Sequence, residues 1–257
     1  MFNVILQAKN PGLMKTVIFI HGNASSSRVF EPIIQTWQLP IQLKAIDLPG
    51  HGNSPRKEEY SWNSNKNFLL EKINHIEGDV ILMGNSLGGL YAVELAPMIR
   101  SLKGIVLIGS SPLKKPVNFK EAFLPNPHTE AFLKVRPTEK EIDDATSEAV
   151  QNKAVIPLLK EDFYSTDTKA RTKLLDWLSA PNVFQDQVEI FSKLQCSKYI
   201  IVGKEDTIVN PDYLKKLVKE ALNPIEFIEM ENCGHVPTIE KPVEFTKLLV
   251  KICDEAF

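Results

Sequence analysis

The chain has 257 residues, of which 43% are hydrophobic, so it can bury a sizeable core and most simply forms one domain. Its 30 lysine and arginine residues nearly balance 32 aspartate and glutamate residues, and the formal net charge is −2 at pH 7. Because no long run of one sign is present, the sequence lacks a basic stripe that would follow a phosphate backbone, and nucleic acid is not an expected partner.

The three cysteines are few, odd in number and widely spaced, at positions 196, 233 and 253. This spacing fits neither a disulfide framework nor a CxxC metal site, so we expect reduced thiols. The first 15 residues, MFNVILQAKNPGLMK, lack the basic start, long apolar stretch and cleavage site of a secretory leader, and no run of 18 apolar residues occurs. We therefore expect a soluble cytoplasmic protein without membrane contact, in an oligomeric state that the sequence leaves open.

Short apolar runs of strand length recur along the chain, and turn residues follow them. Their nearly continuous Val, Ile and Leu cores indicate strands covered on both faces, at 16–22, 41–50, 79–86, 104–111, 197–206 and 225–235. Helical spacing of apolar residues lies between them, at 65–76, 86–99, 211–222 and 242–256. Pro211 and Pro242 fit the first turns of the last two helices. This alternation predicts a mostly parallel, doubly wound α/β sheet.

One long stretch, from about residue 112 to residue 194, interrupts this alternation. It contains no convincing strand, and prolines punctuate short helical patterns such as TEKEIDDATSEAV and TKARTKLLDWL. Because a structureless loop of that length is improbable, we predict a helical insertion. The expected organisation is a core from residues 1–111 and 195–257, with an inserted segment at 112–194.

Ser86 lies at the centre of GNSLG, residues 84–88, which matches the pattern G-x-S-x-G. A predicted strand precedes this motif and a predicted helix follows it, which is the setting of a nucleophile elbow. There a strained turn presents the serine hydroxyl, and small neighbours let the helix approach the strand closely. We therefore predict that Ser86 is a nucleophile rather than a solvated turn serine or a helix N-cap.

A serine hydroxyl is a weak nucleophile and needs a base, normally an imidazole that a carboxylate orients. His235 follows the last predicted strand and is the expected base. Asp206, just past the preceding strand, is the expected carboxylate; the adjacent Glu205 is the rival, but neighbouring loop side chains point in different directions. The chain order Ser86, Asp206, His235 is the order of hydrolases with this elbow.

Backbone amides usually stabilise the oxyanion in such reactions. In the sequence FIHGNASSS, a turn at His21 and Gly22 would direct the amide of Asn23 into the pocket, opposite the amide of Leu87. His21 itself is expected to be a buried structural hydrogen-bonding group rather than a proton carrier. The loop DLPGHGNS is likewise expected to fix local structure.

The motifs HGN, DLPGHGNS, GNSLGG, VGKED and GHVPTIEKP stand in the order found in the α/β-hydrolase superfamily, and they span residues 16–257 apart from the insertion. The sequence resembles the serine esterases and lipase-like members of that superfamily that carry a helical cap. The resemblance implies an α/β-hydrolase fold with residues 112–194 as the cap, or lid, that shapes the pocket. Relatives that open epoxides or displace halides have an aspartate nucleophile where this chain has Ser86, so those reactions are disfavoured.

The expected function is hydrolysis of a small or medium carboxylic ester through an acyl-enzyme on Ser86. Phe123, Phe132, Phe163 and Trp177 are candidates for lining the substrate pocket, or else for holding the cap together. The same triad could instead cleave a carbon–carbon bond next to a ketone, hydrolyse a thioester or amide, or transfer an acyl group. A hydrolase-like receptor for a small ligand is the remaining alternative. The sequence has no HExxH, carboxylate cluster or phosphate-binding glycine loop, so no metal or cofactor is expected.

Overall fold

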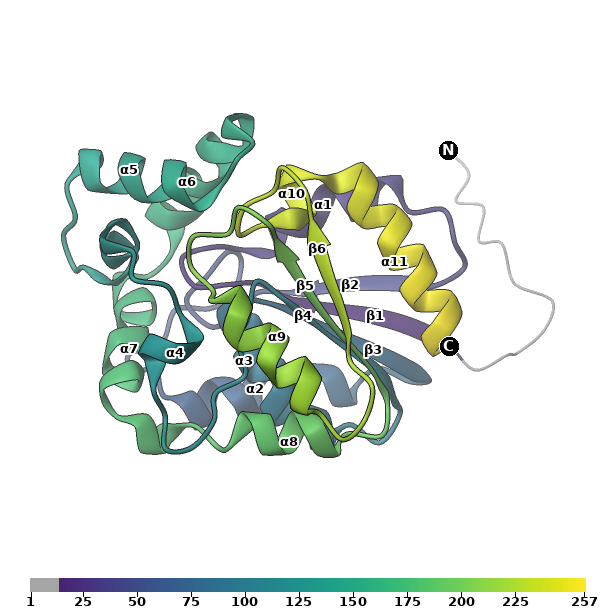
Figure 1. The fold of residues 1–257 in the computed structure, drawn as a ribbon. Helices are drawn as coiled ribbons and strands as arrows, with labels where there is room; N and C mark the ends of the chain where they lie inside the picture. The colour runs from purple at the N-terminus through teal and green to yellow at the C-terminus, as the bar shows by residue number, and fades with distance from the viewer. Residues whose placement is uncertain (1–13) are drawn as a thin grey trace, which may run out of the picture.

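The computed structural model describes residues 14–257, and its centre is a sheet of six parallel strands (Figure 1). The strand order across the sheet is β2-β1-β3-β4-β5-β6. The strands are β1 (Lys15–Ile20), β2 (Gln42–Ile46), β3 (Asp79–Asn85), β4 (Leu102–Ile108), β5 (Ser197–Gly203) and β6 (Glu226–Met230). The predicted doubly wound α/β sheet is confirmed. Residues 1–13, to which most of the prediction about a leader applies, lie outside the described residues.

Helices cover both faces of the sheet, because successive strand residues point to opposite sides. Ile18 and Ile20 of β1 belong to the core on one face, and Val17 and Phe19 belong to the core on the other. The first face is covered by α2 (Trp62–Asn74), α3 (Leu87–Leu95), α8 (Gln187–Lys193) and α9 (Pro211–Glu220). The second face is covered by α1 (Glu31–Thr36), α10 (Pro237–Glu240) and α11 (Pro242–Ala256).

The four predicted helices correspond to α2, α3, α9 and α11, and Pro211 and Pro242 are the first residues of α9 and α11, as predicted. One expectation needs correction, because the two outermost strands are not covered as the inner ones are. β2 and β6 are the edges of the sheet, and most of their residues are half-buried or exposed, whereas β3 and β4 are almost entirely buried. An edge strand has a neighbouring strand on one side only, so less of it is covered.

The inserted segment at 112–194 is helical, and within it the only strand-like feature is an isolated bridge at Phe123. Besides α8, the segment contains the α-helices α4 (Phe119–Ala122), α5 (Glu139–Ala149), α6 (Ile156–Ser165) and α7 (Thr168–Ser179). Figure 1 shows α4 to α7 beyond the carboxyl ends of the strands, whereas α8 lies beneath the sheet beside α3. The amide side chain of Gln187 on α8 donates to the carbonyl of Leu90 on α3 at 3.3 Å. Most of the inserted segment therefore lies over the sheet end where the predicted site residues meet.

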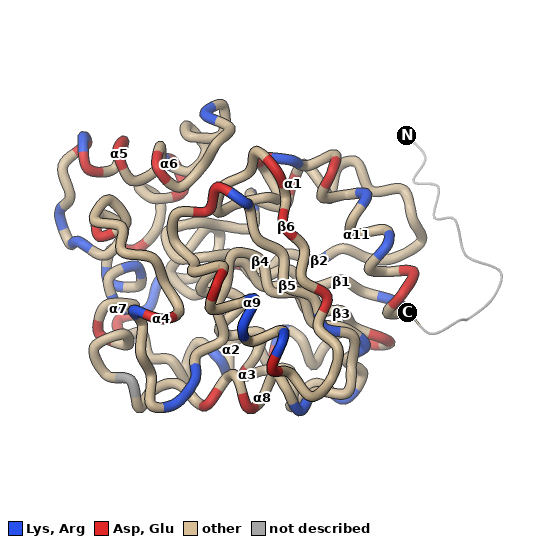
Figure 2. Tube along the Cα trace, viewed as in Figure 1, with Lys and Arg blue, Asp and Glu red and all other residues tan. Residues whose placement is uncertain are grey.

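The charged residues are distributed over the whole molecule, and Figure 2 shows both signs interspersed along most elements. Of the helices that the structure describes, none is long and apolar enough to cross a membrane. In the same residues, no group of three or more His, Cys, Asp or Glu side chains is placed to hold a metal ion. The cytoplasmic location stays a prediction from the sequence.

Candidate active site

Ser86 occupies the sharp turn between β3 and α3. Its backbone has φ 51° and ψ −118°, a conformation that residues other than glycine rarely adopt. The amide of Ser86 donates to the carbonyl of Ile108 on β4 at 2.8 Å, which anchors the turn to the sheet. A Cβ at Gly84 would lie 2.3 Å from the carbonyl oxygen of Gly88, so only glycine permits this approach of helix to strand. The strained turn that the motif predicted is therefore present.

Asp206 and His235 form a hydrogen-bonded pair beyond the carboxyl ends of β5 and β6. The distance from Asp206 Oδ2 to His235 Nδ1 is 2.8 Å, and Asp206 Oδ1 accepts a hydrogen bond from the amide of Ile208 at 2.8 Å. Glu205 accepts a hydrogen bond from the amide of Cys233 at 2.8 Å instead. Of the two adjacent acidic residues, Asp206 is thus the one that meets the imidazole.

The environment of His235 favours the protonated imidazole. Burial by itself lowers the pKa of His235, but the charge of Asp206, its hydrogen bond and the charge of Glu240 together outweigh burial and raise the pKa above its ordinary value of 6.5. Because Asp206 is a carboxylate, the neutral ring carries its hydrogen on Nδ1 and its lone pair on Nε2. Above its pKa, the imidazole can therefore accept a proton at Nε2.

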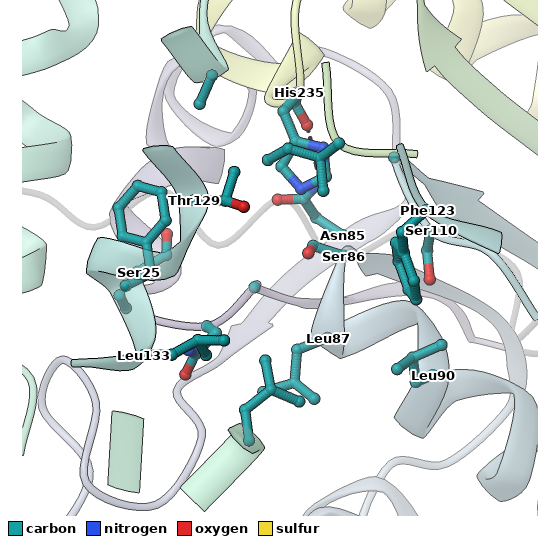
Figure 3. Close-up of a pocket in the computed structure, with 18 of the residues that line it drawn as sticks. Ser25, Asn85, Ser86, Leu87, Leu90, Ser110, Phe123, Thr129, Leu133 and His235 are labelled. Carbon is teal, nitrogen blue, oxygen red and sulfur yellow. Dashed lines mark hydrogen bonds between the residues drawn. The ribbon is translucent and has the colours of Figure 1, made fainter. Parts of the chain in front are cut away.

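Ser86 and His235 line one cavity, which has a volume of about 800 Å³. Figure 3 labels both side chains among those that line the cavity, with Ser86 near the centre of the view and His235 above it. Among residues 14–257, the Ser86 hydroxyl has no hydrogen-bond partner, so the serine and the imidazole share the cavity without a direct hydrogen bond. Such bonds are often long in a free enzyme and shorten when substrate binds.

The two amides predicted to bind an oxyanion belong to residues that line this cavity, Asn23 and Leu87. Leu87 is the first residue of α3, so its amide has no acceptor within that helix. In the described part of the chain, the amide of Asn23 has no acceptor either. A Cβ at Gly22 would lie 3.1 Å from Ser86 Cβ, which shows how close this turn is to the serine. The side chain of Asn23 donates to the carbonyl of Arg171 on α7 at 3.1 Å.

The rest of the cavity wall is mainly apolar and comes largely from the inserted segment. Among the side chains that form it are Phe119, Phe123, Phe132, Leu133, Leu174 and Leu178. Phe123 and Phe132 therefore line the cavity, which is the first of the two roles considered for these aromatic residues. An apolar wall beside a small number of polar groups is typical of a pocket for a small organic ligand.

Phe163 and Trp177 do not line the cavity, so the pocket-lining role is wrong for these two candidates. The ring of Phe163 packs 6.1 Å from that of Phe132, and the guanidinium of Arg171 lies 4.2 Å from its centroid. Trp177 is buried against Trp62 of α2, with ring centroids 5.5 Å apart. Both residues hold the inserted segment together or attach it to the core, which was the alternative for these aromatic residues.

Two residues that support the site, Glu240 and Asn85, were missed by reasoning from the sequence alone. The carboxylate of Glu240 accepts hydrogen bonds from the amides of Gly234 at 2.9 Å and Val236 at 3.0 Å, on either side of His235. The side chain of Asn85 donates to the carbonyl of His235 at 3.2 Å. The available signal for Glu240 was an acidic residue in the apolar stretch HVPTIEKP, which does not reveal that its partners are backbone amides.

Comparison with known sequences identifies relatives over most of the chain. The profile of the alpha/beta hydrolase family matches residues 17–248. The chain is 31% identical over 225 residues to a Mycoplasma genitalium protein with the provisional name esterase/lipase 1, and the match covers 80% of this chain and 79% of that protein. A shorter match to Esterase Rv0045c of Mycobacterium tuberculosis is 35% identical over 105 residues and covers 39% of this chain and 35% of that protein.

Solved structures share the whole architecture. The N-acyl homoserine lactonase AidH has a TM-score of 0.81 and 22% identity, with 96% of this chain and 91% of that chain covered. An esterase from Thermogutta terrifontis has a TM-score of 0.76 and 18% identity, with 95% and 91% covered. At these identities the likeness shows a common fold and not a common substrate. With the family match and the Mycoplasma genitalium relative, the fold and site geometry place this chain in the α/β hydrolase family.

Proposed function

We propose that the protein is a serine esterase that cleaves small or medium carboxylic esters through an acyl-enzyme. The observation that carries this proposal is the meeting of Ser86, the bonded pair of His235 and Asp206, and the backbone of Asn23 and Leu87 at one largely apolar cavity. The relatives named esterases support an ester as the substrate class. A cavity of about 800 Å³ suits a compact substrate.

In the first half-reaction, Nε2 of His235 takes the proton of Ser86 Oγ while that oxygen attacks the carbonyl carbon of the ester. The carbonyl oxygen becomes an oxyanion, and the amides of Asn23 and Leu87 donate hydrogen bonds to it. Asp206 keeps the imidazole in the tautomer with a free Nε2 and stabilises the imidazolium. The imidazolium then gives its proton to the leaving alkoxide, so the alcohol departs and the acyl group stays on Ser86.

In the second half-reaction, a water molecule gives a proton to Nε2 of His235 while its oxygen attacks the acyl carbon. A second oxyanion forms at the same two amides. The bond to Ser86 Oγ then breaks, and that oxygen takes the proton back from the imidazolium. One ester and one water thus become one carboxylic acid and one alcohol, and the enzyme returns to its first state.

We also infer that the inserted segment serves as the cap of this pocket. Its helices α4 to α7 lie beyond the strand ends, and it supplies most of the apolar wall (Figure 1). Polar contacts attach it to the core at several points, among them the bond from Ser26 Oγ to the buried carboxylate of Asp162 at 2.8 Å. The remaining helix, α8, packs with α3 and contributes to the core instead.

The proposal is tested by whole-protein mass after treatment with a fluorophosphonate, a reagent that phosphonylates activated serines. The wild type should take one stoichiometric adduct, and Ser86→Ala and His235→Ala should take none. Ser25→Ala is a matched control, because Ser25 also lines the cavity but lacks the positive φ of Ser86, and this variant should label like the wild type. Folded wild type without an adduct would contradict the proposal and favour a hydrolase-like receptor.

The substrate class needs a separate measurement, because thioesters, amides and carbon–carbon bonds next to a ketone could be cleaved by the same groups. Nitrophenyl esters of increasing acyl length, matched thioesters and a vinylogous diketone should be compared by kcat/KM. We expect the highest value for a short or medium ester. A higher value for a thioester or diketone would keep the role of Ser86 and replace the substrate class.

A further inference from the structure

Glu240, the last residue of α10, has a buried carboxylate whose partners are backbone amides. It is 4% exposed, and the hydrogen bonds that its carboxylate accepts within residues 14–257 all come from backbone amides. Its oxygens accept hydrogen bonds from the amides of Gly234 at 2.9 Å, Val236 at 3.0 Å, Gln151 at 2.7 Å and Asn152 at 3.3 Å. A buried carboxylate is stable only when hydrogen bonds replace its hydration. The four donors therefore hold this charge in place.

The four amides come from two segments that are far apart in the sequence. Two of them flank His235, and the other two follow α5 in the inserted segment. Further contacts join the same segments: the amide of His235 donates to the carbonyl of Ala149 at 2.8 Å, and the side chain of Asn152 donates to the carbonyl of Glu240 at 3.3 Å. The loop of His235 is therefore fastened to the end of α5, with Glu240 at the centre of the junction.

The two segments are in close contact, so the loop has little freedom to shift. A Cβ at Gly234 would lie 2.5 Å from the carbonyl oxygen of Ala149 and 2.9 Å from the Cα of Val150. The carbonyl of His235 is held from the other side by Asn85. A displacement of the loop would move Nε2 of His235 relative to the serine, and misplacement of reacting groups by about 1 Å can lower a rate about 100-fold.

Two negative charges act on His235. Asp206 contacts Nδ1 from the loop after β5, and Glu240 acts from α10 without a hydrogen bond to the ring. Burial lowers the pKa of His235. The two charges, together with the hydrogen bond to Asp206, outweigh burial, so the pKa lies above its ordinary value. Glu205, Cys233 and Lys241 are further titratable groups around this loop. The carboxylate of Glu205 accepts from the amide of Cys233. Burial raises the pKa of the Cys233 thiol, which keeps it neutral, although the charge of Lys241 acts on it in the opposite direction.

We propose that Glu240 is a positioning residue, which ties the loop of His235 to residues 149–152 and so holds Nε2 in place to serve Ser86. The inference rests on the proposed function and deepens it. Glu240 touches the reacting atoms at no point and acts through the peptide groups beside the base. It follows that the geometry of the base depends on the inserted segment being seated against the core.

The principal test is Glu240→Gln, which removes the charge and leaves a side-chain NH₂ facing a backbone donor. With active sites counted by fluorophosphonate labelling, kcat on a nitrophenyl ester should fall about 10- to 100-fold while KM changes little. The acid limb of the kcat/KM profile should move to lower pH, because one charge that raises the pKa of His235 is gone. Glu244→Gln, the same change at an exposed carboxylate on α11, should behave like the wild type.

A second variant, Glu240→Asp, separates the effect of the negative charge from the effect of side-chain length. It keeps the negative charge, so its acid limb should stay closer to that of the wild type than the limb of Glu240→Gln. It shortens the side chain, so kcat should still fall. A loss of stability alone would lower the melting temperature and leave the acid limb of the folded molecules unchanged, which distinguishes a purely structural role.

NMR titration of the His235 ring protons supplies a readout that needs no catalysis. A lower pKa of His235 in Glu240→Gln, with no change in Glu244→Gln, supports the inference even if the wild type turns over no ester, which would defeat only the proposed function. An active, Ser86-dependent wild type together with an unaltered pKa and kcat in Glu240→Gln would overturn the inference alone. If neither Glu240 variant folds, Glu240 is a folding determinant and the inference is also overturned.

Discussion

The molecule contains two pairs of histidine and aspartate beyond its strand ends, and they differ in what their imidazoles can do. Beyond β1, His21 Nε2 lies 3.7 Å from Asp47 Oδ1. Beyond β6, His235 Nδ1 lies 2.8 Å from Asp206 Oδ2. All four side chains come from loops that follow strands, and both imidazoles are buried. Placement along the chain therefore does not separate the two pairs.

The two imidazoles differ in which of their ring nitrogens form hydrogen bonds with backbone groups. The amide of Leu48 donates to Nε2 of His21 at 2.9 Å, so Nδ1 carries the hydrogen and donates to the carbonyl of Gly22 at 2.7 Å. Burial lowers the pKa of His21 by more than this bond and the charge of Asp47 raise it. In His235, Nδ1 is occupied, and Nε2 has no partner among the described residues. A free ring nitrogen, more than a nearby carboxylate, distinguishes the candidate base.

The largest expected effect separates the two histidines by substitution. His235→Ala should lower kcat/KM by about 10⁴- to 10⁶-fold, because Ser86 loses its proposed base. His21→Ala should instead cost about 2–4 kcal/mol of unfolding free energy, because two backbone groups lose their partner and a cavity opens. Urea unfolding and kcat/KM per folded molecule would measure both effects. Similar activity losses in the two folded variants would break the comparison.

The two aspartates should differ in the same sense. Asp206→Asn should lower kcat/KM about 10⁴-fold, because an amide in place of the carboxylate favours the wrong tautomer of His235. Asp47 accepts from the amides of Ser27 at 2.6 Å and Asn53 at 2.8 Å, so Asp47→Asn should leave one donor unpaired and cost about 1–3 kcal/mol of stability. Steady-state kinetics beside thermal unfolding of both variants would check this. A large stability loss confined to Asp206→Asn would reverse the assignment.

As the pH falls, the pKa shifts of His51 and His235 should change the free energy of unfolding in opposite directions. Burial, with the neighbouring His21, lowers the pKa of His51 to about 3, so its contribution is present above the unfolded value of 6.5 and is lost as pH falls toward 3. The raised pKa of His235 gives a contribution that is present below 6.5 and is lost as pH rises through the folded value.

Removing His235 should therefore steepen the loss of stability in acid. Wild type should melt at a lower temperature at about pH 5 than at about pH 7, and His235→Ala should show a larger difference between the two. The acid limb of wild-type kcat/KM should have its midpoint above 6.5, because the neutral imidazole is the active form in the proposed mechanism. A smaller pH dependence of melting in His235→Ala would show that the signs are misassigned.

The smallest expected effect concerns Asn23, which lies two residues after His21 and whose backbone amide is proposed to bind the oxyanion. Asn23→Ala keeps the amide proposed to bind the oxyanion but removes the side-chain bond to Arg171. One hydrogen bond contributes about 1 kcal/mol, so kcat should fall about 3- to 10-fold. Asn223→Ala is a matched control, because that side chain also donates to a backbone carbonyl, that of Ser192 at 3.1 Å. Equal kcat values in the two variants would show that the bond to Arg171 does not steady the turn.

Much of the fold and most of the candidate site could be predicted from the sequence, because both depend on local patterns. Buried strands have continuous apolar cores, and the turn at Ser86 and the residues at strand ends follow from motif and order. The orientations of Phe163 and Trp177 could not be predicted, because packing decides which face of a helix in the inserted segment meets the cavity. Glu240 was missed because its partners are backbone amides, which every residue but proline possesses.

The apolar wall of the cavity and the proposed reacting groups come from different stretches of the chain, and this separation has a consequence for laboratory evolution. Most of the apolar wall comes from residues 119–133 and 156–178, whereas the reacting groups proposed here lie on loops of the core. A gene library confined to those two stretches, with residues 149–152 and Arg171 kept constant, would vary the shape of the pocket while the proposed chemistry stays intact. Substrate range and catalytic machinery can in this way be selected one after the other.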